Sequence, residues 1–122
     1  MVDRNHLIST GNAAKDGRRG WFVGQFMPPH LGLSHQQAVE IKWGQHAKGE
    51  RRRGFAQSKG TTIAVLVKGS FLTQLRLPDE MRQITLTEPG DYVAFAPGVE
   101  HCWEALAESL VITVRFPSLK ED

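Results

Sequence analysis

His101 and its neighbours form the most concentrated group of chemically useful side chains in the sequence. His101 and Trp103 are separated only by Cys102. Successive side chains of a β-strand point to opposite faces, so the imidazole and the indole would share one face and Cys102 the other. Imidazole has an unperturbed pKa of about 6.5, which suits proton transfer near neutrality. Cys102 is expected to pack as a small hydrophobic residue rather than to act as a nucleophile.

Three consecutive arginines are the second group that offers chemistry. Arg51, Arg52 and Arg53 lie in a polar stretch that runs from residue 47 to residue 60. Guanidinium groups bind carboxylate and phosphate through paired hydrogen bonds. In an extended chain Arg51 and Arg53 would point one way and Arg52 the other. The run predicts either a site for an acidic ligand or a hydrated loop, and the sequence leaves both open.

Short strands must position these groups. Turn sequences such as Pro89-Gly90 divide the chain into β-favouring stretches. Strands are predicted over residues 21–27, 39–43, 61–67, 71–77, 82–87, 91–95, 101–106 and 110–116. About eight short strands without a long helix are typical of a sandwich or barrel, so the fold class is all-β.

The strand over residues 39–43 has the clearest pattern. Val39, Ile41 and Trp43 alternate with charged residues, which predicts a half-buried strand with its apolar residues in the core. Gly44 follows directly and marks a candidate β-bulge. A bulge there would change the side to which His46 points.

The length of 122 residues predicts one domain. We expect a flexible lead-in or short helical turn over residues 1–20, the folded domain over 21–117 and a tail over 118–122. The net charge of +2 is too weak to favour nucleic acid as a partner, and no apolar run suggests a membrane. Cys102 is the only cysteine, which excludes a disulfide within the chain and favours a cytoplasmic location.

The stretch before His101 carries a family resemblance. Gly90, five further residues and then Ala96-Pro97-Gly98-Val99-Glu100-His101 resemble the second conserved motif of the cupin superfamily, with the proline one place late. Residues 62–69 resemble the end of the first cupin motif, and the likeness extends over residues 39–116. It implies a jelly-roll β-barrel, a homodimer and a small-molecule pocket inside the barrel.

The resemblance also implies where a metal would bind. Metal-binding cupins take two histidines and a glutamate from the first motif and one histidine from the second. Counted back from Gly69, the glutamate position falls on Thr62 and the histidine positions fall between Gly54 and Ser58. Of the usual ligand set, this leaves only His101.

A substitute ligand set is available elsewhere in the sequence. His46 and Glu50 are four residues apart and would meet His101 at the barrel mouth. Two imidazoles and a carboxylate suit a divalent metal such as iron, zinc, manganese or nickel. The alternative is that no metal binds and that each histidine is solvated or packed in the core.

Aromatic residues are expected to complete the pocket. Trp103, Trp43 and Tyr92 could supply apolar area with one polar handle each, which suits an aromatic ligand. Trp103 shares a face with His101 and is the strongest of the three. Trp43 has core packing as its alternative role, because it continues the apolar face of its strand.

These observations favour a small cupin-like enzyme that binds an acidic or aromatic molecule in the barrel and uses His101, assisted by His46, as metal ligand or acid/base. Oxygenase, isomerase and lyase chemistry all stay open. One alternative is a non-catalytic sensor or carrier without metal, in which Arg51, Arg52 and Arg53 hold the ligand. Another is a structural subunit of an assembly, since residues 21–27 are apolar on both faces.

Overall fold

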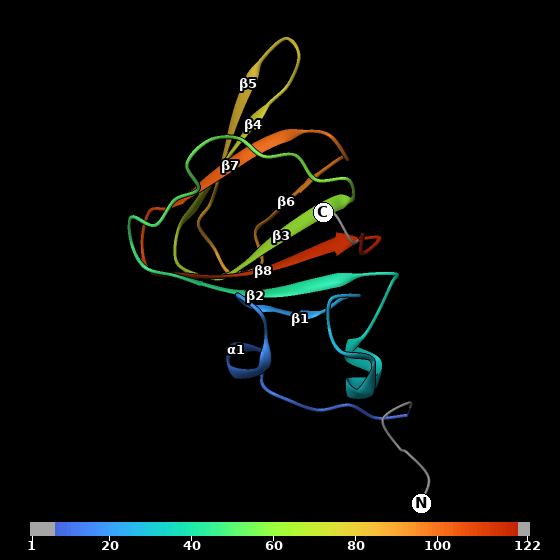
Figure 1. Cartoon of the computed structure of the whole chain (residues 1–122). Coiled ribbons are helices and arrows are strands. Elements are labelled where there is room, and N and C mark those ends of the chain that lie inside the picture. The colour runs from blue at the N-terminus through green and yellow to red at the C-terminus, as the bar shows by residue number, and fades with distance from the viewer. Residues whose placement is uncertain (1–6, 120–122) are drawn as a thin grey trace, which may run out of the picture.

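The computed structural model describes residues 7–119, and its regular structure is almost entirely β (Figure 1). The elements in chain order are α1 (Ala13–Asp16), β1 (Trp21–Val23), the 3-10 helix η1 (Pro29–Ser34), β2 (Glu40–His46), β3 (Thr61–Lys68), β4 (Phe71–Arg76), β5 (Met81–Leu86), β6 (Tyr92–Phe95), β7 (Glu100–Ala105) and β8 (Ser109–Phe116). Neither α1 nor η1, nor any other helix within residues 7–119, is long and apolar enough to cross a membrane.

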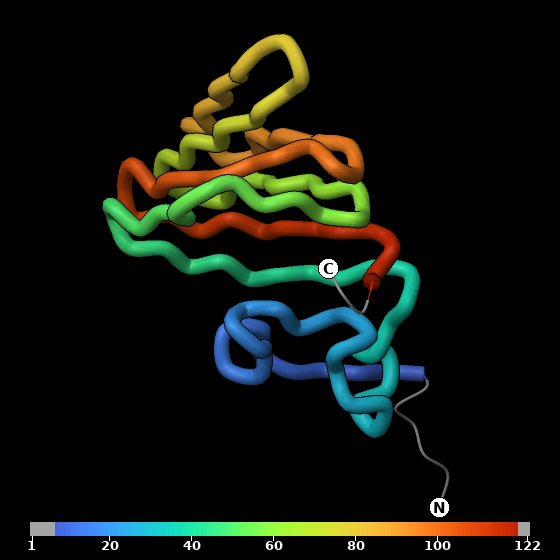
Figure 2. Tube along the Cα trace, turned by 45° about the horizontal axis from the view of Figure 1, so that its top comes forward, coloured from blue at the N-terminus to red at the C-terminus, as the bar shows by residue number. Residues whose placement is uncertain are grey.

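Two antiparallel sheets form the barrel. The larger sheet has the strand order β1-β2-β8-β3-β6 and the smaller sheet the order β5-β4-β7. The two sheets lie over one another (Figures 1 and 2). The all-β jelly-roll barrel predicted from the sequence is thereby confirmed.

The polar stretch before β3 extends the smaller sheet. Residues 49–56 run antiparallel to β7, with isolated bridges from Arg51 to Glu104 and from Ala56 to His101. The Arg52 N–H donates to the Trp103 carbonyl at 3.0 Å, which fixes the arginine run beside the strand that carries Trp103. The predicted loop is therefore held in an extended conformation over much of its length.

The hydrophobic core fills one end of the barrel. Leu66, Leu86 and Val111 are almost completely buried, and they pack with Phe71 and Ala105. Burial of each large aliphatic side chain contributes about 1.5–3 kcal/mol. The core closes this end of the lumen and leaves the space beside β2 for other side chains.

The N-terminal segment lies along the β1 and β2 edge of the barrel (Figure 2). Asn12 caps α1, because its side chain accepts hydrogen bonds from the backbone N–H groups of Ala14 and Lys15 at 3.0 and 3.1 Å. The Ser9 hydroxyl ties the preceding residues to η1 through Leu31 and Leu33. Part of the predicted flexible lead-in also lies within residues 1–6, outside the described residues.

Two predicted boundaries differ from the structure. The strand expected over residues 21–27 ends at Val23, because Gly24 turns the chain and bonds to η1 instead of to β2. Ser118, predicted to lie in a tail, is buried, and its backbone N–H donates to the Gln37 carbonyl at 3.0 Å. The fold therefore continues at least one residue beyond Pro117.

Candidate functional site

Strand β2 presents its polar face to the lumen. Lys42 pairs with Thr113 of β8, and Gly44 pairs with Val111 in unbroken register, so β2 has no bulge at Gly44. A side chain at Gly44 would meet the Val111 carbonyl oxygen at 3.0 Å, which explains the glycine by close packing. Lys42 and His46 therefore share the inner face. The prediction that Ile41 and Trp43 face the core is corrected: alternation places them on the outer face.

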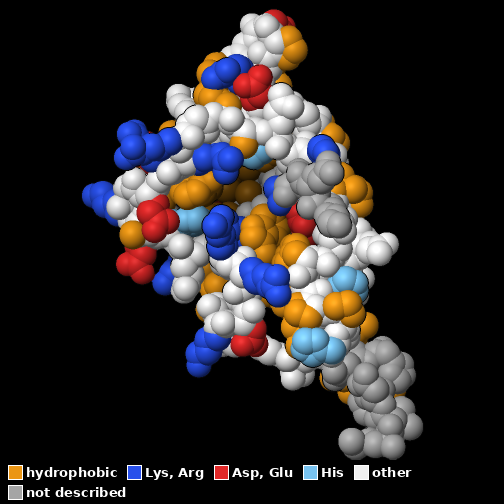
Figure 3. All heavy atoms as spheres, viewed as in Figure 1, with side chains coloured by type: hydrophobic (Ala, Val, Ile, Leu, Met, Phe, Trp, Pro, Cys, Tyr) orange, Lys and Arg blue, Asp and Glu red, His pale blue; other side chains and the backbone are white. Residues whose placement is uncertain are grey.

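A cavity of about 400 Å³ lies between the two sheets. Four aromatic residues contribute surface to it: Trp21, Phe71, Phe95 and Trp103. In the view into the barrel, hydrophobic side chains floor this hollow while basic side chains and imidazoles surround it (Figure 3). The site combines an apolar interior with a positively charged rim.

Four basic residues from distant parts of the chain line the cavity: Arg19, Lys42, Arg52 and Arg115. No aspartate or glutamate is found among the described residues that line it. Arg115 is the only one of the four with a carboxylate partner in the described part of the chain. Three cations thus face the lumen without an acidic partner within residues 7–119.

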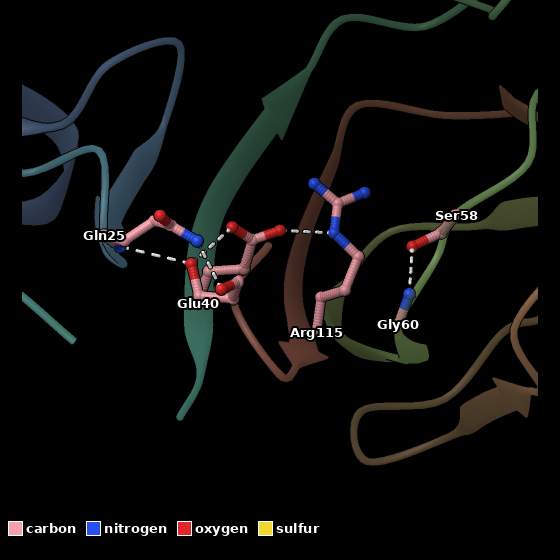
Figure 4. Close-up of polar contacts among 6 residues, drawn as sticks. Gln25, Glu40, Ser58, Gly60 and Arg115 are labelled. Carbon is pink, nitrogen blue, oxygen red and sulfur yellow. Dashed lines mark hydrogen bonds and ion pairs between the residues drawn. The ribbon is translucent and has the colours of Figure 1, made fainter. Parts of the chain in front are cut away.

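Arg115 is anchored by a buried carboxylate. Its Nε atom donates to Oε1 of Glu40, which is only 2 % exposed, and the Ser118 hydroxyl donates to the other carboxylate oxygen at 3.0 Å (Figure 4). The guanidinium carbon lies 4.6 Å from the centre of the Trp21 ring. These contacts hold the guanidinium group at one end of the lumen.

Lys42 lies on the inner face of β2 between the other cations. Burial, followed by the positive charges of Arg115 and Arg52, lowers the pKa of Lys42 from its ordinary value, while Glu50 opposes the shift. The ammonium group is 5.8 Å from the centre of the Trp21 ring. A bound anion would relieve this unfavourable charge.

Arg19 reaches the lumen from a tight turn that the sequence analysis did not identify. Arg18 and Trp21 exchange backbone hydrogen bonds of 2.7 and 2.9 Å, and Arg19 and Gly20 between them have φ angles of 53° and 90°. Two positive φ angles in a two-residue connection are typical of a type I′ turn. The Gly20 carbonyl also accepts from the Trp43 N–H at 2.7 Å, which fastens the turn to β2.

His46 is held by an acidic partner and two aromatic rings. Its Nδ1 atom is 2.9 Å from Oε2 of Glu50, and its ring centre is 4.4 Å from that of Trp103 and 5.4 Å from that of Phe71. The hydrogen bond from His46 is the main cause that lowers the pKa of Glu50. Glu50 lies beside the lumen rather than in it and orients the imidazole.

His101 is the second imidazole of the lumen. Its Nδ1 atom is 3.1 Å from the Val99 carbonyl oxygen, and its ring centre is 4.6 Å from that of Phe95. A carbonyl oxygen can only accept, so Nδ1 carries the proton and Nε2 is the basic atom of the neutral ring. Strand alternation places His101 and Trp103 on one face of β7, and both line the cavity, as does Cys102 between them.

Cys102 lies between them, and its thiol donates to Oε1 of Gln74, the residue opposite it in β4, at 3.0 Å. Burial raises the pKa of the Cys102 thiol, which favours the inert role expected from the sequence.

The other predicted site residues are divided between the lumen and the outer surface. Arg52 lines both the lumen and a separate outer groove, whereas Arg51 and Arg53 line only the outer groove of the two. Tyr92 is 66 % exposed and does not line the cavity, because strand alternation turns its neighbour Val93 inward instead. Trp43 lies outside the lumen next to Ala14 of α1.

The donor set does not fit a divalent metal. No group of three or more His, Cys, Asp or Glu side chains within residues 7–119 is arranged to hold a metal ion, so His46, Glu50 and His101 do not form one. Thr62, at the glutamate position of the motif, is buried with its hydroxyl lacking a hydrogen-bond partner in the described chain. The surrounding cations would also repel a metal ion. The same basic side chains favour the binding of an anion.

Comparisons with known proteins bear on the fold. No protein-family model matches the sequence, and no curated protein matches it. Oxalate decarboxylase from Bacillus subtilis has a similar structure, with a TM-score of 0.62 and 19% identity over 70% of this chain and 22% of that chain. One study of that enzyme names its Mn(II) centres.

Two further solved structures, whose chains are covered to more than two thirds, also match. KdgF from a Halomonas species gives a TM-score of 0.58 at 23% identity, over 73% of this chain and 79% of that chain. A cupin superfamily protein from Desulfitobacterium hafniense gives 0.59 at 17% identity, over 69% and 72%. At these identities the likeness establishes the fold, which is that of the cupins.

Proposed function

We propose that the lumen of this cupin-fold barrel binds a small organic anion, a carboxylate or a phosphate with an apolar or aromatic body. The observation that carries this proposal is the set of four basic side chains around a cavity to which no described carboxylate contributes. Guanidinium groups form strong charge-assisted hydrogen bonds with both kinds of anion. The aromatic rings of the lumen would contact the rest of the molecule.

The size of the cavity fits this class of ligand. Small-molecule sites in proteins are usually about 300–1,000 Å³, and the lumen is about 400 Å³. Arg52 and Arg115 lie on opposite sheets, so an anionic group between them would neutralise both. The buried Thr62 hydroxyl would offer one further hydrogen bond to the ligand.

Calorimetric titration with benzoate tests the proposal, and benzamide serves as the neutral probe of the same shape. We expect benzoate to bind and benzamide not to bind. Arg52→Gln should weaken benzoate binding about tenfold or more, because a hydrogen bond to a charged group contributes about 1.5–3 kcal/mol. Arg53→Gln is the matched control, since Arg53 does not line the lumen. Equal affinity of the two variants, or equal binding of the two probes, would count against a basic lumen site.

The metal content of the purified protein provides a second test. Elemental analysis of protein prepared without chelator or nickel affinity should show no stoichiometric iron, zinc, manganese or nickel, because the lumen lacks a suitable donor group. A stoichiometric metal that disappears in the His101→Ala variant would show that this interpretation of the lumen is wrong. The homodimer expected from the cupin resemblance stays a prediction.

A further inference from the structure

Lys42 differs from an ordinary surface lysine in its surroundings. It lies on the inner face of β2, and the residues in its row across the sheet are uncharged: Trp21, Thr113, Ala64 and Val93. No carboxylate within residues 7–119 forms an ion pair with Lys42. The charge of Glu50 favours the protonated ammonium group, but burial and the two nearby guanidinium groups outweigh it.

The positive neighbours of Lys42 strengthen this effect. Arg115 lies two residues beyond Thr113 on β8, and Arg52 lines the cavity from the smaller sheet. Both guanidinium groups and the burial of the side chain lower the pKa of Lys42. A lysine that is desolvated or next to another cation is a better nucleophile, because more of its amine is uncharged at neutral pH.

The same arginines would position an acid next to this amine. A carboxylate held between Arg52 and Arg115 would place its carbon chain beside β2, where Lys42 projects into the cavity. A carbonyl group next to the carboxylate would then lie near the Lys42 Nζ atom. Simple acids without a carbonyl group would bind to the same guanidinium groups and would not react.

We propose that Lys42 forms a reversible imine with a small oxo acid whose carboxylate is bound by Arg52 and Arg115. This inference rests on the proposed function, because it requires an anion in the lumen. In the reaction the neutral Nζ attacks the carbonyl carbon and a C–N bond forms, while the carbonyl oxygen takes up a proton. Loss of that oxygen as water, with breakage of the C–O bond, gives the protonated imine. One proton is consumed and one water is released.

The lumen also contains groups that can transfer the protons of this reaction. His46 and His101 both line the cavity, and imidazole exchanges protons readily near neutral pH. The protonated imine keeps a positive charge next to the bound carboxylate. It would draw electrons from the neighbouring C–C and C–H bonds of the acid, as lysine imines do in covalent catalysis.

Reductive trapping tests the inference directly. The full chain is incubated with pyruvate and sodium cyanoborohydride, and labelled peptides are identified by mass spectrometry. We expect the reduced adduct at Lys42 and its suppression by excess acetate, which has the carboxylate but no ketone. The Lys42→Arg variant keeps the charge and should lose the adduct on this peptide. Lys68→Arg, which changes an exposed lysine at the end of β3, should keep it.

The outcomes separate this inference from the proposed function. Calorimetry with pyruvate and benzoate is carried out on the same protein. Binding of both anions with no adduct at Lys42, or with labelling spread evenly over the lysines, would overturn the imine and leave anion binding intact. Absence of binding by either anion would overturn both proposals. Trapping at Lys42 that Lys42→Arg abolishes, while benzoate still binds to that variant, would support both.

Discussion

Arg19 has a backbone conformation that suits glycine or asparagine better than arginine. Its φ angle of 53° lies in the left-handed region, which costs an ordinary L-residue about 1–2 kcal/mol. The turn nevertheless places an arginine among the residues that line the lumen. We interpret the unfavourable conformation as the consequence of a requirement for positive charge at this position.

Replacing Arg19 with asparagine should therefore have opposite effects on stability and binding. We expect Arg19→Asn to raise the free energy of unfolding by about 1 kcal/mol, since asparagine tolerates the left-handed region, and to weaken benzoate binding. Urea unfolding and calorimetry measure the two quantities. Arg18→Asn is the control, because Arg18 does not line the lumen. A variant that binds benzoate like the wild type would remove Arg19 from the site.

Lys42 should make stability depend on pH in the alkaline range. Its pKa is lowered in the folded state, so the unfolded chain binds the proton more tightly. The resulting loss of stability is fully present below the lowered pKa and is relieved as the pH rises through that pKa towards the ordinary value of 10.5.

We expect Lys42→Met to be more stable than the wild type at neutral pH and to lack this alkaline gain. Urea unfolding midpoints of both proteins, measured from neutral pH to above 10.5, would show the difference in stability and its dependence on pH. The same variant should bind benzoate more weakly, since it loses one cation of the lumen. A Lys42→Met protein that is less stable than the wild type at neutral pH would contradict the claim that the charged Lys42 side chain destabilises the folded state.

The sequence predicted some of the individual residues that line the lumen and missed others. His101, Trp103 and Arg52 could be identified because each stands in a short local pattern, a motif or an alternating run. Arg19, Lys42 and Arg115 come from three distant stretches, and only the pairing of β2 with β8 and the turn before β1 bring them together. No local pattern distinguishes them from surface residues.

Strand β2 shows why the sequence analysis assigned one element the wrong orientation. The positions of the strands followed from turn residues and β-branched runs, and seven of the predicted strands agree with the structure to within a few residues. The alternation of Ile41 and Trp43 with charged residues predicted the apolar face as the inner one. That rule is reversed on this strand, because the Glu40 carboxylate accepts a hydrogen bond from Arg115 and Lys42 lines the cavity.

The close packing of β2 on β8 gives a prediction for this strand. Gly44→Ala would place a methyl group 3.0 Å from the Val111 carbonyl oxygen and 3.0 Å from His46 Nε2. We expect a loss of about 1–3 kcal/mol in the free energy of unfolding, measured with urea, because the backbone contact cannot relax as a side chain can. Gln45→Ala, on the exposed outer face, is the control. Unchanged stability of Gly44→Ala would indicate that the two strands are less tightly packed.

The whole molecule shares its fold with oxalate decarboxylase, which has Mn(II) centres, but its lumen lacks a group of side chains that could hold a metal ion within residues 7–119. The positions that correspond to the ligands of the first cupin motif hold Thr62 and uncharged residues between Gly54 and Ser58, and basic side chains line the cavity. The net charge of the chain is only +2, so this positive character is local to the cavity. Fold likeness alone therefore does not identify the chemistry of the site.

The three tryptophans allow the most direct measurement of where an anion binds. Trp21 and Trp103 line the lumen, whereas Trp43 lies on the outer face and serves as an internal control. Their indole N–H signals can be followed by nitrogen-15 NMR during titration with benzoate. We predict that the Trp103 and Trp21 signals shift with a common saturation curve and that the Trp43 signal stays in place. Saturable binding that moves only Trp43, or none of the three, would contradict an anion site in the lumen.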